Sequence, residues 1–115
     1  MLVVEAGMPL PRQLDPRQVK QLLDEGKRIV LLDVREPQEV AVVRIEGAVH
    51  IPMGEIPARL HELDPEADIV VYCHHGMRSA NVCGFLQQRD FHSVANLTGG
   101  IDAWAATVDP TLARY

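Results

Sequence analysis

Two short apolar runs, at residues 29–34 and 68–72, restrict what this chain can fold into more than any other feature of its sequence. Each run is nearly continuous, rich in β-branched residues, and too short for a helix with capping turns. Such runs are typical of strands buried on both faces, as in a parallel sheet. The sequence therefore predicts a parallel sheet that helices cover on both sides.

The segments around these runs alternate between strand and helix patterns. Strands are expected at residues 13–14, 29–34, 48–51, 68–72 and 93–97. Helices are expected at residues 15–26, 36–43, 57–63 and 79–88, and after the Gly99-Gly100 turn. This alternation predicts an α/β domain with a mostly parallel sheet of about five strands and helices on both faces.

A chain of 115 residues fits one domain, so residues 1–115 are predicted to form a single unit. Its first part, residues 1–12, carries little periodic signal and is expected to be loose. A domain of this size buries about two-thirds of its unfolded surface, which is enough for a core without disulfides or metals.

Charge and hydropathy exclude several classes of partner. The 16 acidic residues outnumber 11 basic ones, without a basic stripe, so we expect no nucleic acid partner. We expect no membrane partner either, because no apolar run approaches the roughly 18 residues of a membrane span. The N-terminus lacks the basic segment of a secretory signal, and two cysteines are too few for a disulfide framework. These features predict a cytoplasmic protein with free thiols.

The loop after the second apolar run carries the residues most suited to chemistry. Ligands of open parallel sheets bind beyond the carboxyl ends of the strands, where Cys73 follows the run at 68–72. Residues 73–79 (CHHGMRS) lead directly into a predicted helix, so their backbone N–H groups and the helix dipole form an anion cradle. A thiol at the rim of such a cradle is stabilised as the nucleophilic thiolate.

Three other loop residues have expected roles. Gly76 permits the tight backbone path, Arg78 offers a permanent charge and a planar fork to an anionic substrate, and Ser79 is the predicted N-cap of the next helix. The remaining members of the cradle, expected to act mainly through their backbone, are His74, His75 and Met77. A gap-filling side chain is the simpler interpretation of Met77.

Asp33 and Arg35 end the first apolar run, at the same edge of the predicted sheet, and are expected to support the site. Cys83 lies on the apolar stripe of its helix, which predicts a small core residue. The cysteines and histidines are also potential metal ligands. Their spacing fits no zinc pattern, since adjacent histidine side chains in an extended loop diverge, and we expect neither metal nor cofactor.

Four motifs, taken together and in this order, are similar to those of single-domain rhodaneses. They lie at residues 32–36 (LDVRE), 45–48 (IEGA), 71–79 (VYC, continuing into CHHGMRS) and 96–101 (NLTGGI, followed by Trp104). The resemblance runs from Leu14 to Tyr115 and implies a rhodanese-like fold. It also implies sulfur transfer by double displacement: Cys73 is the nucleophile, residues 74–78 cradle its persulfide, and Asp33 and Arg35 brace the site.

The resemblance also implies partners. The donor is a small anion such as thiosulfate, or a persulfide, as a cysteine desulfurase supplies. The acceptor is a thiophile: cyanide, a thiol or a sulfur-carrier protein. Residues 43–45 (VRI) replace the Gly-His-Ile of many rhodaneses, and Val40 replaces an aromatic residue. Together with residues 108–110, Arg44-Ile45 is more similar to rhodanese domains joined to adenylyltransferases that charge ubiquitin-like sulfur carriers.

Two other functions stay open at this point. One is a non-catalytic persulfide- or redox-sensing module, which the small size of the chain favours. The other is a small phosphatase or arsenate reductase of the same fold. Related phosphatases carry C-x5-R, whereas four residues separate Cys73 from Arg78 here, a spacing that favours sulfur over the larger phosphate.

Overall fold

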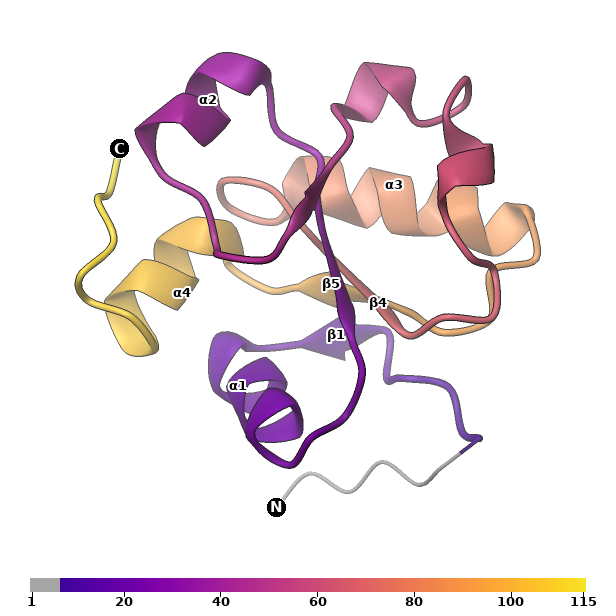
Figure 1. Ribbon diagram of the computed structural model, residues 1–115, viewed down its shortest axis with the longest axis horizontal. Coiled ribbons are helices and arrows are strands. Elements are labelled where there is room, and N and C mark those ends of the chain that lie inside the picture. Colours follow the sequence, from indigo (N-terminus) through magenta and orange to yellow (C-terminus); the bar gives the residue numbers. More distant parts are fainter. Residues whose placement is uncertain (1–6) are drawn as a thin grey trace.

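A five-stranded sheet runs through the middle of the protein in the computed structural model, which describes residues 7–115 (Figure 1). The strands are β1 (Gln13–Leu14), β2 (Val30–Asp33), β3 (Val49–His50), β4 (Ile69–Tyr72) and β5 (Val94–Leu97). Their spatial order is β1-β5-β4-β2-β3, and every neighbouring pair is parallel. The predicted α/β class with its parallel sheet is confirmed.

Helices cover both faces of the sheet (Figure 1). The α-helices are α1 (Pro16–Asp24), α2 (Pro37–Val42), α3 (Met77–Gln88) and α4 (Gly100–Thr107). Two short 3-10 helices, η1 (Met53–Glu55) and η2 (Leu60–Glu62), lie between β3 and β4. Side chains of α1 and α4 pack in one core cluster, and those of α3 pack in the other.

The side chains of β4, the central strand, point alternately to the two faces of the sheet. Val70 and Tyr72 point into the cluster shared with α1 and α4, whereas Ile69 and Val71 point into the cluster shared with α3. All four residues are fully buried. A strand buried on both faces needs apolar residues at every position, which is the pattern that its sequence carries.

The start of α1 follows the sequence closely. Gln18 N donates to Asp15 Oδ1 and Asp15 N donates to Gln18 Oε1, both at 2.9 Å. Pro16 takes the first helical position, where no N–H donor is needed. Asp15 and Gln18 therefore form a capping box at the start of α1.

The predicted helix at residues 57–63 is wrong. The chain there forms turns and the 3-10 helix η2, and the separate η1 lies just before them. Most backbone bonds in this segment reach only three residues back. Ile56 and Leu63 are buried and anchor the segment against the α3 side of the sheet. The apolar spacing that predicted a helix therefore corresponds to two separate buried side chains and not to one continuous helix.

The segment at residues 1–12 is loose in the sequence-based prediction, and residues 1–6 of it lie outside the described part. Leu10 is buried and its N–H donates to Ser93 Oγ at 2.8 Å, so this part of the segment is held against the domain. None of the helices within residues 7–115 has the length and hydrophobicity of a transmembrane span.

Candidate active site

Backbone amides and the hydroxyl oxygen of Ser79 surround the sulfur of Cys73, which directly follows β4. Gly76 N donates to Cys73 Sγ at 3.1 Å and Ser79 N donates to it at 3.4 Å. The Ser79 hydroxyl oxygen lies 3.4 Å from the same sulfur. The loop therefore presents the N–H groups of Gly76 and Ser79 to the sulfur.

Cys73 lies deeper than the sequence predicts. Its side chain is 1% exposed and belongs to the core cluster beside α3, with Val82 among its neighbours. The expectation of a thiol at the rim of the cradle is wrong, because the chain turns back over the sulfur before α3 begins. The sulfur forms the floor of the cradle instead.

The two thiols have opposite electrostatic surroundings. Burial by itself raises the pKa of Cys73, but hydrogen bonding to Ser79 and to the amides of Gly76 and His75 outweighs it and lowers this pKa below its usual value. Burial, with a contribution from the charge of nearby Cys73, raises the pKa of Cys83 to about 12. Cys83 is 5% exposed on the inner face of α3, which confirms the prediction of a core residue.

The predicted N-cap at Ser79 is wrong, because α3 begins two residues earlier. Gly76 is the N-cap, with a φ of 110° that glycine adopts without strain. Ser79 instead lies in the first turn, fully buried, and its hydroxyl donates to Asn96 Oδ1 at 2.6 Å. Asn96 Nδ2 donates to Gly76 O at 3.1 Å, so one side chain of β5 holds both ends of the turn.

The first residues of α4 orient the outer part of the loop. Ile101 N donates to Cys73 O at 2.9 Å, and Asp102 N donates to His74 O at 3.1 Å. With these carbonyls held by α4, the neighbouring amides are free to point toward the sulfur. Gly100 permits this approach, since a Cβ there would lie 2.3 Å from His74 O.

Asp33 and Arg35 form a buried ion pair beside the site. The Arg35 guanidinium donates to both Asp33 oxygens, at 3.0 and 2.7 Å, and to Val43 O at 2.7 Å. It also donates to the Tyr115 hydroxyl at 3.0 Å. These contacts tie the end of β2 to the end of α2 and to the C-terminal tail.

The Arg78 guanidinium is already engaged by a carboxylate. It donates to both oxygens of Glu39, at 2.7 and 2.9 Å. The hydrogen bond from Arg78 is the largest cause that lowers the pKa of Glu39 to about 2. The Tyr115 hydroxyl also donates to Glu39, at 2.7 Å. The guanidinium that the sequence assigns to an anionic substrate is therefore paired with a carboxylate of the protein.

The histidine side chains lie together rather than apart. The rings of His74 and His75 have centroids 3.8 Å apart, and His74 also stacks on Tyr115 at 3.8 Å. Asp102 completes a group whose potential metal-ligating atoms all lie within 4.8 Å of one another. The premise that adjacent histidines diverge is thus wrong. Met77 is 82% exposed, so it fills no gap.

The predicted site residues did not include Glu39, Asn96 or Tyr115, whose side chains bond around the loop. The sequence contains a signal for Asn96, because this residue lies near the carboxyl end of a strand, in the NLTGGI motif. Glu39 and Tyr115 carry no such signal, since their partners are distant in the sequence.

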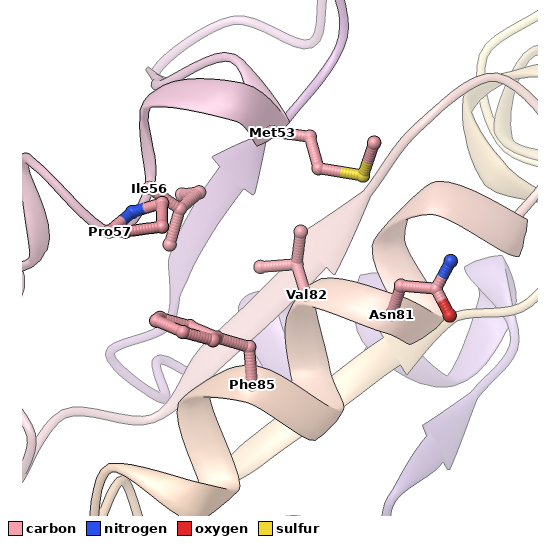
Figure 2. A pocket seen from close by; sticks show the side chains of 6 residues that line it. All are labelled: Met53, Ile56, Pro57, Asn81, Val82 and Phe85. Carbon is pink, nitrogen blue, oxygen red and sulfur yellow. The ribbon is translucent and has the colours of Figure 1, made fainter.

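A small apolar pocket of about 160 Å³ lies between η1 and α3. Figure 2 shows its lining side chains, which are Met53, Ile56, Pro57, Asn81, Val82 and Phe85. Val82 also contacts the core cluster of Cys73, so the pocket flanks the site on its α3 side. Its lining suits an apolar group and not an anion.

Comparisons with known proteins agree with this geometry. The sequence model of the rhodanese-like domain matches residues 15–107. A sulfurtransferase of Allochromatium vinosum is 39% identical over 93 residues, which cover 81% of this chain and 87% of the relative. The putative sulfurtransferase YtwF of Bacillus subtilis is 38% identical over 99 residues, which cover 86% of this chain and 95% of the relative.

A solved structure shares the fold. The crystal structure of a rhodanese-like domain protein from Staphylococcus aureus superposes with a TM-score of 0.79 at 30% identity, covering 91% of this chain and 99% of that one. The match to the family and the two sulfurtransferase relatives lead to one conclusion: this chain belongs to the rhodanese-like sulfurtransferase family.

Proposed function

We propose that the protein transfers sulfane sulfur through a persulfide on Cys73. The observation that carries the proposal is the convergence of the Gly76 and Ser79 amides on Cys73 Sγ. Donors that lower the pKa of a buried thiol favour its thiolate, which is the attacking form. The same donors suit the negative charge of a persulfide.

The reaction has two steps in this proposal. The Cys73 thiolate attacks the outer sulfur of the donor, the donor S–S bond breaks, and its electron pair leaves with the donor remnant: sulfite from thiosulfate, or a thiolate from a persulfide. A thiophile such as cyanide then attacks the outer sulfur of the Cys73 persulfide, forms thiocyanate and releases the thiolate. No electrons are gained or lost overall.

The protein-level partners belong to the same proposal. A sulfur-carrier protein or a cysteine desulfurase would meet the face around the loop, where Met77 is 82% exposed. Exposed methionine adapts to varied partner surfaces. Both cysteines are free, which supports a reducing compartment such as the cytoplasm.

Mass spectrometry of the intact protein tests the proposal. After incubation with thiosulfate or a persulfide donor, the wild type is expected to gain one sulfur and to lose it on addition of cyanide. Cys73→Ala is expected to gain none, whereas Cys83→Ser, which removes the other thiol, is expected to gain one. A wild type that accepts no sulfur from any of these donors refutes the proposal.

A non-catalytic persulfide sensor is the second candidate, and the 1% exposure of Cys73 favours it. Turnover separates the two functions. A transferase releases many equivalents of thiocyanate per protein when donor and cyanide are in excess, and a sensor releases one.

A further inference from the structure

The Glu39 carboxylate neutralises the charge of Arg78, which lies in the first turn of α3 at the end of the loop. Two short hydrogen bonds join its guanidinium to the Glu39 carboxylate, and the side chains are 33% and 18% exposed, respectively. The Tyr115 hydroxyl donates to the Oε2 atom of the same carboxylate at 2.7 Å. A donor approaching Arg78 therefore also approaches the negative charge of Glu39.

Two other guanidinium groups near the loop are neutralised in the same way. Arg35 pairs with Asp33 at 2.7 Å, and Arg114 pairs with Asp102 at 3.0 Å. Asp102 is the residue whose N–H holds the carbonyl of His74. These three pairs supply no net charge, so the attraction for an anion comes from the amides and the dipole of α3.

We propose that Glu39 is a specificity-determining residue: by cancelling the charge of Arg78, it removes the preference for dianionic donors such as thiosulfate that an unpaired guanidinium would create. Donors with a single negative charge, such as persulfides, are thereby favoured relative to a site with an unpaired Arg78. This inference rests on the proposed sulfur transfer and adds the class of donor. The energy of a donor in the field of Glu39 scales with the donor's charge, so the carboxylate penalises a dianion twice as much as a monoanion.

Two matched donors isolate the charge. Thiosulfate carries two negative charges, and methanethiosulfonate carries one because a methyl group replaces one oxygen. Attack of the Cys73 thiolate on the outer sulfur forms the same persulfide from both, with sulfite leaving in one case and methanesulfinate in the other. A change in the reactivity of the thiolate affects both reactions and cancels in their ratio.

The test compares kcat/KM for the two donors in the wild type and in Glu39→Gln, which keeps the shape of the side chain and removes its charge. In Glu39→Gln we expect kcat/KM to rise about 25-fold for thiosulfate and about 5-fold for methanethiosulfonate. The first factor is the square of the second, because removal of one charge changes the energy of a dianion twice as much as that of a monoanion. Glu62→Gln is the matched control, because Glu62 also forms two bonds to a guanidinium, that of Arg59. It is expected to change neither value. Equal gains for both donors in Glu39→Gln overturn the inference.

A charge-balance experiment gives a second, independent test. Arg78→Ala leaves Glu39 unpaired and is expected to lower kcat/KM for thiosulfate by about 25-fold. The double variant Glu39→Gln/Arg78→Ala carries neither charge, so this position is neutral again. Its kcat/KM for thiosulfate is expected to return to about the wild-type value. If Arg78 instead binds thiosulfate directly, kcat/KM of the double variant stays as low as that of Arg78→Ala, and the inference fails.

Failure of the inference and failure of the proposed function are distinguishable. Loading of Cys73 by methanethiosulfonate in the wild type and in Glu39→Gln shows that the fold and the transfer chemistry are intact. With loading present, only the ratio of the two donors decides the role of Glu39. With loading absent from both proteins and both donors, the proposed sulfur transfer itself is refuted.

Discussion

At the scale of single residues, the surroundings of one thiol favour its charged form and those of the other do not. Amides and Ser79 surround Cys73 and lower its pKa, whereas Cys83 has no comparable set of donors and its pKa rises to about 12. Both side chains are buried, so exposure does not distinguish them. The direction in which backbone N–H groups point makes the difference, because each donor favours the charged form of the sulfur.

This contrast predicts the pH dependence of the thiols. In Cys83→Ser, thiolate absorbance in the ultraviolet is expected to rise at a pH below the ordinary thiol pKa of 9.0, because the donors around Cys73 stabilise its thiolate. In Cys73→Ser, the rise is expected above pH 9.0, because burial still raises the pKa of Cys83. A Cys73 thiolate that first forms above pH 9.0 contradicts the role assigned to the amides.

At the scale of elements, the site is built where α3 and α4 begin. Gly76 turns the chain into α3, and Gly100 brings the first amides of α4 against the loop carbonyls. These junctions depend on a backbone path that residues with a Cβ rarely adopt. The NLTGGI motif therefore serves a loop that lies about 25 residues earlier in the chain.

Gly100→Ala tests this account of the loop. Gly100 has a φ of 63° and no room for a Cβ, so the substitution is expected to cost about 1–3 kcal/mol of unfolding free energy and to slow sulfur loading. Gly84→Ala is the matched control, because Gly84 lies inside α3 with nothing within 4 Å of the added carbon. There, alanine is expected to stabilise the protein by up to about 1 kcal/mol. Chemical denaturation measures both, and similar values would contradict the account.

At the scale of the whole molecule, one buried guanidinium connects distant parts of the chain. Arg35 follows β2, yet its bonds reach the end of α2 and the hydroxyl of Tyr115 in the tail. Its own partner, Asp33, is 1% exposed and depends on this charge. A buried carboxylate without a partner is unfavourable in free energy, so the loss of either charge destabilises the protein.

Removal of this guanidinium is therefore expected to be severe. Arg35→Ala leaves the Asp33 carboxylate buried without a partner and should cost about 3–5 kcal/mol of unfolding free energy. Arg59→Ala breaks ion pairs on the surface and should cost less than about 1 kcal/mol. The denaturation midpoints of the two variants provide the comparison. Equal midpoints would mean that Arg35 does not brace the molecule.

The sequence by itself determined the alternation of strands and helices, the parallel sheet, and a cysteine loop at a strand end. These features follow from local periodicity and from the rule that parallel strands share one carboxyl edge. Only the tertiary structure decided that Cys73 forms the floor of the cradle, that Ser79 bonds Asn96, and that Glu39 neutralises Arg78. The physical reason is that these contacts join residues far apart in the chain, whose meeting depends on how the packed helices place them.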